Sequence, residues 1–426
     1  MSIPAARSKF LVPAVAIALV ALWCVALNEV SLHTWGFGAL NFGLMFAMVG
    51  LVVGAKVWGR RVRDSALSVP VVIAASVVAA VVLGWFLYGQ FSVFQANADK
   101  DLGSDIAANT YAADFFAFDL QQNPYTSHAQ TGHRVDDAPN VARVNGQLEM
   151  FGVPYYYGYP YFPAMFFLYQ PFRWGDSTPQ AIRTGNGVYY FLLLAAMAWL
   201  AAILVPKGYR VLAALLSMLG FAATLALAGE LFMFCTTDIV IPLFTLLGFI
   251  ALKYGRHSLS GALIGWVFAC KLVPGGLFVL LFLIWFWRRP ERWKFLIPMF
   301  AVILAVIVPY VLKDPSAFLS ATILYYLTEH AQGDSTALWF TLPAAIKPLF
   351  QIVGYSSVVA LIGYAATRKS FGLPGALAIC FVAGAVFVAF NRMAHLNYIW
   401  AIAPIGAVAL VGGALGGTRE ASTAIG

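Results

Sequence analysis

Four aspartates follow a long apolar run in a chain of 426 residues of which only 10% are charged: Asp101, Asp105, Asp114 and Asp119. After Asp105 in the sequence, apolar side chains recur at helical spacing, which predicts an amphipathic helix on a membrane surface. On such a helix Asp101 and Asp105 share one face. Burial at the rim of an apolar cavity raises a carboxyl pKa toward neutrality, so Asp105 is a candidate general base. The simpler alternative is that these acids hydrate an external loop.

Lys271 ends an apolar segment, in the sequence GWVFACKLVPGG. A lysine without a partner inside a bilayer costs roughly 3 kcal/mol, so the sequence predicts a partner for its ammonium group. We expect that partner to be a lipid phosphate at the outer boundary of the membrane. In the alternative, the side chain extends to the interface and is hydrated there.

A third group of polar residues lies in the sequence FNRMAHLNYIWAIAP, near the end of the chain. Arg392 offers a planar guanidinium for phosphate oxygens, and His395 can donate to one or titrate near neutral pH. A single arginine at this position is ordinarily an interface anchor. Together with Lys271, these residues predict a phosphate site that faces the acidic segment.

Weaker candidates for substrate binding are polar residues scattered over the same loops: Asp101, Asn109, Tyr111, Glu230, Asp238, Glu329 and His330. Asp101, Asp105 and Asp238 could bind a divalent metal, but no spacing requires one, and we expect no metal and no other required cofactor. The sequence contains no Walker motif and no nucleotide-binding glycine loop after a strand. An enzyme that faces outward would therefore take its activated group from a lipid carrier.

Composition predicts a membrane protein around these residues. The chain is 61% hydrophobic and only 10% charged, whereas soluble domains are about 25% charged. The net charge of +8 comes from short loops between apolar runs, so we expect no nucleic-acid partner. Runs of the length that a bilayer requires predict about twelve spans. They lie at 10–28, 38–56, 67–89, 184–205, 211–228, 237–253, 259–271, 273–288, 295–312, 341–366, 372–390 and 396–414.

The distribution of basic residues predicts the orientation of these spans. Five basic groups lie between spans: 56–63, 207–210, 253–256, 288–294 and 368–369. Simple alternation puts all five on the cytoplasmic side if the N-terminus is cytoplasmic. The C-terminus then also lies in the cytoplasm, and the candidate residues all lie on the outer face of the cytoplasmic membrane.

The whole chain, 1–426, is expected to form a single all-α membrane domain with two long extracytoplasmic loops, 90–183 and 313–340. The apolar run from Tyr159 to Phe172 is short and contains three prolines. Counting it as a span would invert every later helix. We therefore interpret it as a juxtamembrane element at the outer interface, where aromatic residues are common.

An ordered set of motifs over residues 100–410 resembles the GT-C superfamily of membrane glycosyltransferases, most closely glycosyltransferase family 87. The set comprises the acidic segment GSDIAANTYAADFFAFDLQQNPY, then YGYPYFP, SLSGALIGWVFACKLVPGGLFVL, GDSTALW and AHLNYIWAIAP. This family includes mannosyltransferases that use polyprenyl-phosphate-mannose. The chain differs from the family in having two spans before the one that leads to the acidic loop, where one is expected.

The resemblance implies a polyprenyl-phosphate-linked sugar donor, transfer of mannose as in the family, and inversion at the anomeric carbon. It implies that Asp105 is the catalytic base, and that Lys271, Arg392 and His395 bind the phosphate of the donor. The spacing from Asp105 to the Asn-Pro-Tyr sequence is slightly long, which leaves Asp101 and Asp114 as alternatives for the base. The acceptor would be a lipid or a glycan.

Two other classes of protein fit parts of the same pattern. A transporter or flippase for a lipid-linked sugar would share the cations but would not need a base, and it should show repeat symmetry, which we do not detect. A surface-polysaccharide polymerase or ligase would share the lipid-phosphate leaving group.

Overall fold

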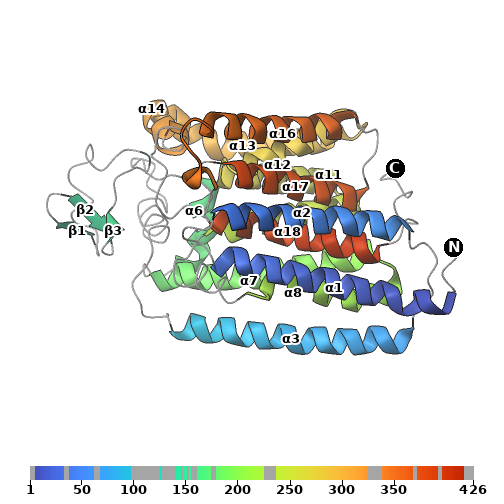
Figure 1. The fold of residues 1–426 in the computed structure, drawn as a ribbon. Coiled ribbons are helices and arrows are strands. Elements are labelled where there is room, and N and C mark those ends of the chain that lie inside the picture. The colour runs from blue at the N-terminus through green and yellow to red at the C-terminus, as the bar shows by residue number, and fades with distance from the viewer. Residues whose placement is uncertain are drawn as a thin grey trace.

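The fold is a bundle of helices that run side by side in alternating directions (Figure 1). The computed structural model describes residues 5–32, 38–61, 68–96, 125, 141–144, 147–150, 153–154, 161–173, 179–224, 237–324, 338–367, 372–391 and 396–416. The long helices are α1 (Ala5–Leu32), α2 (Gly38–Arg61), α3 (Val69–Ala96), α7 (Pro179–Leu204), α13 (Arg292–Lys313), α16 (Lys347–Thr367), α17 (Leu373–Phe390) and α18 (Leu396–Leu415).

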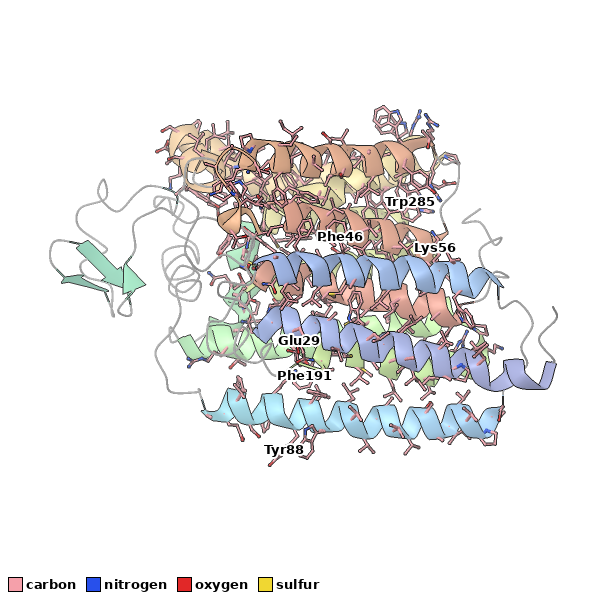
Figure 2. All side chains as sticks on the ribbon, in the orientation of Figure 1. Glu29, Phe46, Lys56, Tyr88, Phe191 and Trp285 are labelled. Atoms are coloured by element: carbon pink, nitrogen blue, oxygen red, sulfur yellow. The ribbon has the colours of Figure 1, made fainter. Side chains whose placement is uncertain are left out.

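Within the described residues, these eight helices are long and apolar enough to cross a membrane. Their outer faces support this assignment. On α3, Val77, Val81 and Trp85 are among the exposed apolar side chains, and Tyr88 points away from the bundle (Figure 2). Soluble monomers rarely expose contiguous apolar surface of this extent, so these faces are suited to lipid. The chain is a multi-pass membrane protein.

Four further helices are only 13 or 14 residues long: α8 (Arg210–Ala222), α10 (Val240–Lys253), α11 (His257–Cys270) and α12 (Gly275–Trp287). Each coincides with a predicted span, although α8 ends six residues before the predicted end at 228. Helices of this length extend about 20 Å, less than the hydrocarbon core of a bilayer. The total of twelve spans therefore stays a prediction.

The centre of the bundle is α18, and 94% of the most apolar 18-residue window of this helix is buried. It packs against α1, α2, α7, α8, α10 and α17. The helices α3 and α16 lie at opposite edges in Figure 1, and only 17% of each corresponding window is buried. The element that begins just after Arg392 and His395 is thus held by the protein on all sides.

Basic residues begin or end several helices at one end of the bundle. Arg210 begins α8, Lys253 ends α10 and Arg292 begins α13. These residues lie at the end where α1 begins and α18 ends, which we call the basic end (Figure 1). Lys271, between α11 and α12, lies at the opposite end, which we call the Lys271 end. The division agrees with the alternation predicted from the basic loops.

Short elements occupy the loops. The 90–183 loop was predicted to contain helices, but it also contains a three-stranded antiparallel sheet, so the all-α expectation was wrong for this segment. The sheet pairs β1 (Val141–Val144) with β2 (Gln147–Met150) and β2 with β3 (Val153–Pro154). The remaining elements are α6 (Ala164–Tyr169), η1 (Gln170–Arg173), η2 (Lys207–Tyr209), η4 (Thr237–Ile239), α14 (Pro315–Leu319), the π-helical turn η5 (Ser320–Leu324) and η6 (Leu338–Thr341).

In the described part of the apolar run from Tyr159 to Phe172, residues 161–172, the helical elements are the six-residue helix α6 and the 3₁₀ turn η1. Six helical residues extend about 9 Å, so this helix is too short to cross a bilayer. The structure therefore agrees with excluding this run from the spans. Its placement at an outer membrane interface stays a prediction.

Candidate functional site

Lys271 lies where the chain turns back between α11 and α12. It follows Cys270, the last residue of α11, and its backbone is extended. Pro274 disfavours a helical conformation for the residue before it, which helps to end α11 here. At Gly275, a Cβ would lie 2.6 Å from the Val267 carbonyl oxygen, so only glycine permits this close return of the chain.

The ammonium group of Lys271 binds the carboxylate of Asp238. Its Nζ lies 2.9 Å from Oδ1 and 3.1 Å from Oδ2, and the side chains are 4% and 1% exposed. Asp238 belongs to η4, immediately before α10. The pairing supplies the partner that the sequence predicted for Lys271, although we had expected a lipid phosphate. Hydration of an extended Lys271 side chain is excluded by its burial.

Two tyrosine rings complete the surroundings of the ammonium group. The Lys271 Nζ lies 4.8 Å from the ring centroid of Tyr161 and 4.9 Å from that of Tyr398. Both distances are within the range of attraction between a cation and an aromatic ring. Tyr161 precedes α6 and Tyr398 lies in the first turn of α18, so elements distant in the sequence meet at one charge.

The last residue of the acidic segment, Tyr125, also reaches this place. The Tyr125 hydroxyl donates a hydrogen bond of 3.0 Å to the Tyr161 carbonyl oxygen, and the Tyr125 ring lies 4.8 Å from that of Phe318. The Phe162 N–H donates to the Cys270 carbonyl oxygen over 3.0 Å. Because the Phe162 ring stacks on that of Phe318 at 5.6 Å, these side chains form a single packed wall beside Lys271.

The position of α11 depends on its close contact with α13. A Cβ at Gly265 would lie 2.6 Å from the Met299 carbonyl oxygen, and one at Gly261 would overlap the carbonyl oxygen of Phe295. Two glycines four residues apart allow helix backbones to approach in this way inside membranes. The close approach of α13 therefore helps to fix the position of α11, the helix that ends just before Lys271.

At the start of α18, the Asn397 side chain is a second polar feature of the site. Its Oδ1 is buried and has no hydrogen-bond partner among the described residues. The helix packs against η4, which carries Asp238. A buried acceptor without a partner is costly in a native protein, so it is suited to a hydroxyl donor from a ligand.

Sequence reasoning missed Arg183, which lies in the first turns of α7 and is 1% exposed. One turn later, Asn186 is fully buried and accepts a hydrogen bond from the Tyr169 hydroxyl. The start of α7 packs near η4, at the Lys271 end. The signal available in the sequence was an arginine just inside an apolar run, which resembles an ordinary interface anchor.

Among the predicted site residues, Lys271 and Asp238 are brought together directly. The others lie outside the described residues: Asp101, Asp105, Asn109, Tyr111, Glu230, Glu329, His330, Arg392 and His395. Asp114, the alternative base, also lies outside them. Two described residues lie near these positions: Tyr125, the last residue of the acidic segment, contacts Tyr161, and Tyr398, three residues after His395, contacts Lys271.

No protein-family model matches the chain, and no curated protein matches it either. Among solved structures, it is similar to that of ArnT from Cupriavidus metallidurans bound to undecaprenyl phosphate, with 16% sequence identity and a TM-score of 0.41. The alignment covers 77% of this chain and 60% of that one, so the chain spans less than two thirds of the length of ArnT. A likeness of this strength assigns neither a family nor an activity.

Proposed function

We propose that the chain is a glycosyltransferase of the GT-C type that moves a sugar from a polyprenyl-phosphate carrier to a lipid or glycan acceptor. The resemblance of the motifs to family 87 favours mannose as the sugar. The observation that carries the proposal is the buried Lys271–Asp238 pair, on which three distant parts of the sequence converge. These parts are the motif YGYPYFP, the Lys-x-x-Pro sequence and the start of α18.

The convergence matters because the predicted base and the predicted phosphate ligands lie close in the sequence to residues that meet at the pair. Three residues of extended chain span about 10 Å at most, so the proposal puts His395 beside the pair through Tyr398. Tyr125 lies twenty residues after Asp105 and is hydrogen-bonded to the backbone of Tyr161. This contact supports a path of the acidic loop that returns to the Lys271–Asp238 pair.

The pairing of Lys271 refines the role that we give to it. Asp238 keeps the Lys271 ammonium group charged in apolar surroundings. It also balances that charge, so the ammonium group attracts a further anion only weakly. We therefore assign most of the attraction for the donor phosphate to Arg392 and His395. Lys271 would donate to the phosphate as a member of the pair.

The proposed reaction is a single displacement with inversion. The acceptor oxygen forms a bond to the anomeric carbon while the bond from that carbon to the phosphate oxygen breaks. Asp105 takes the proton of the acceptor hydroxyl, and polyprenyl phosphate leaves with the bonding electrons. Proton transfer of this kind contributes about 10²–10⁴-fold to a rate. Donors held around the leaving phosphate stabilise the charge that develops on it.

The proposed site lies on the extracytoplasmic face of a cytoplasmic membrane, and the basic end lies in the cytoplasm, following the positive-inside rule. With this orientation both termini are cytoplasmic. The four helices of 13 or 14 residues complete twelve spans in the proposal, because they lie within the bundle, one after another between α7 and α13.

The test is a transfer assay with purified full-length protein in lipid nanodiscs, given radiolabelled polyprenyl-phosphate-mannose and total membrane lipid. Passage of label to a larger glycolipid is expected for the wild-type chain, and Asp105→Asn should reduce the rate at least 100-fold. Asp101→Asn and Asp114→Asn, measured in parallel, identify the base among the alternatives. Other donor sugars in the same assay define the sugar.

The matched control is Asp314→Asn, which removes a carboxylate at the Lys271 end but keeps an asparagine that can still cap α14. It should transfer at the wild-type rate. In sealed proteoliposomes, movement of intact donor across the membrane without transfer would favour a flippase and contradict the proposal. Equal rates for the wild-type chain and all three aspartate variants would refute the assignment of a carboxylate base in this segment.

A further inference from the structure

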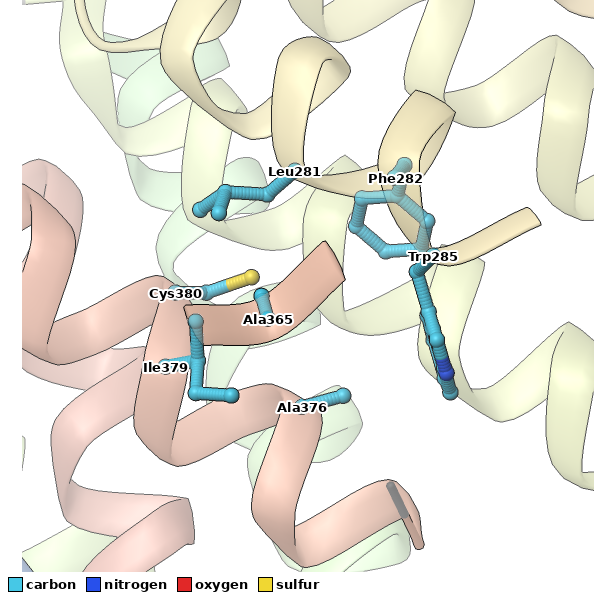
Figure 3. A pocket seen from close by; sticks show the side chains of 7 residues that line it. All are labelled: Leu281, Phe282, Trp285, Ala365, Ala376, Ile379 and Cys380. Atoms are coloured by element: carbon cyan, nitrogen blue, oxygen red, sulfur yellow. The ribbon is translucent and has the colours of Figure 1, made fainter. Parts of the chain in front are cut away.

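An apolar cavity lies between α12, α16 and α17, far along α12 from Lys271 (Figure 3). It is small and partly open, and its lining is almost entirely apolar. Leu281, Phe282 and Trp285 of α12 face Ile379 and Cys380 of α17 across it, and alanines of α16 and α17 form the rest of the lining. A partly open apolar cavity of this size offers water few hydrogen-bond partners and suits contact with part of a hydrocarbon chain.

The cavity ends at a cationic turn. Trp285 lies in the last turn of α12, and the guanidinium carbon of Arg289 lies 4.9 Å from the centroid of its ring. In the segment 288–294, four cationic side chains accompany the single carboxylate of Glu291. This segment, which joins α12 to α13, lies at the basic end.

Trp285 offers a hydrogen-bond donor at the junction of the cavity and the turn. Its Nε1 is buried and has no hydrogen-bond partner among the described residues. The flanking residues Trp287 and Trp293 are 60% and 56% exposed, as expected for indole rings at a membrane interface. An apolar cavity, a donor without a partner and a stacked guanidinium therefore meet at one point.

We infer that this cavity and turn bind one anionic phospholipid, with part of an acyl chain against the cavity and the phosphate at Arg289 and the Trp285 Nε1. A guanidinium binds phosphate oxygens through paired hydrogen bonds, and its stacking on Trp285 holds it in place. The excess of cations on the turn favours a headgroup with net negative charge over a zwitterionic one.

The lipid site is separate from the proposed transfer site. The 13-residue helix α12 begins four residues after Lys271 and ends at Trp287, so about 20 Å of helix lies between the two. The inference rests on the cavity and the arginines and does not depend on the proposed function.

The experiment uses full-length protein that is stripped of lipid in detergent and then titrated with phosphatidylglycerol or with phosphatidylcholine of the same acyl chains. Bound lipids are counted by native mass spectrometry. We expect one molecule of phosphatidylglycerol to bind about tenfold more tightly than phosphatidylcholine. Arg289→Gln should remove this preference, and Ala365→Leu, which narrows the cavity, should weaken the binding of both lipids.

The matched control is Arg210→Gln, which removes an exposed arginine at the same end of the bundle, away from the cavity. It should retain the tenfold preference. Equal affinity of the wild-type chain for the two lipids would overturn the inference, as would equal effects of the Arg289 and Arg210 variants. Tighter binding of undecaprenyl phosphate than of phosphatidylglycerol would assign the site to a carrier lipid and likewise overturn it. Thermal unfolding without lipid checks that all variants fold.

Discussion

The ammonium group of Lys271 and the carboxylate of Asp238, 33 residues apart in the sequence, are joined at 2.9 Å and 3.1 Å in a part of the bundle that is closed to solvent. Each charge alone would be costly there, because neither could be hydrated. The pair fixes η4 to the turn between α11 and α12. It also brings a charge between the rings of Tyr161 and Tyr398.

Removing one member of this pair should destabilise the protein strongly. Lys271→Met leaves the Asp238 carboxylate buried without its partner, and the loss expected for such a change is about 3–5 kcal/mol in the free energy of unfolding. Thermal unfolding in detergent measures the effect. The control Lys207→Met removes an exposed lysine at the basic end and should leave the unfolding temperature nearly unchanged.

Removing both members separates folding from chemistry. In Lys271→Met/Asp238→Leu no buried charge is left, so most of the stability lost in the single variant should return. Transfer of sugar should remain at least 100-fold below the wild-type rate if the pair serves the reaction. A double variant that regains both stability and transfer would show that the pair is structural.

The hydrogen bond from Tyr125 to Tyr161 should contribute to stability separately from the packing of the Tyr125 ring. Tyr125→Phe leaves a buried carbonyl oxygen without this donor, at an expected cost of about 1–3 kcal/mol. Tyr125→Ala also removes a ring that packs on Phe318, and should cost about 3–5 kcal/mol. Tyr88→Phe, on the exposed face of α3, is the control and should change nothing measurable. Equal losses for Tyr125→Phe and Tyr125→Ala would contradict this division.

The sequence was sufficient to predict most helices, because the apolar runs are long and basic residues separate them. The predicted boundaries of α13, α17 and α18 lie within three residues of those observed. The prediction was poorer where a run continued past its helix, as in α8. It also missed β1–β3, because strands of two to four residues leave too short a pattern to detect.

The site was predictable only in part. The cost of a buried ammonium group indicated that Lys271 needs a partner, but only the packing of η4 against the end of α11 identifies Asp238 as that partner. In the sequence, Asp238 is one of several polar residues in a loop. Arg183 was missed for the same reason, since burial at the start of α7 depends on neighbours from elsewhere in the chain.

The close contact of α11 with α13 should be sensitive to a single methyl group. In Gly265→Ala the new Cβ would lie 2.6 Å from the Met299 carbonyl oxygen, so the helices must separate, at a cost of about 1–3 kcal/mol. The control Gly84→Ala adds a Cβ that meets nothing within 4 Å, and should be neutral or stabilising because alanine favours helix. Thermal unfolding of both variants gives the comparison, and a loss in the Gly84 variant as large as in the Gly265 variant would contradict it.

The carboxylate of Asp314 should make the stability of the Lys271 end depend on pH. It accepts hydrogen bonds of 3.0 Å from the Ala317 N–H and from the Ser316 hydroxyl, and so caps the helix whose Phe318 packs on Tyr125 and Phe162. These bonds, that from Ala317 first, hold the pKa of Asp314 below its usual range. A lowered pKa means that the stabilisation is complete above the ordinary aspartate pKa of about 3.9 and is lost as the pH falls through the folded-state value.

Asp314→Ala should lower stability at pH 7 by about 0.5 kcal/mol, near the lower limit for a cap because Asp314 is only partly buried. The difference between the wild-type chain and this variant, measured by thermal unfolding from pH 7 to pH 3, should stay constant down to about pH 5. It should then shrink as the wild-type carboxylate takes up a proton and the capping bonds weaken. Asp314→Asn keeps an uncharged cap, so its difference from the alanine variant should not change with pH. If the wild-type advantage over alanine persists undiminished at pH 3, the charge of Asp314 is not what stabilises this helix.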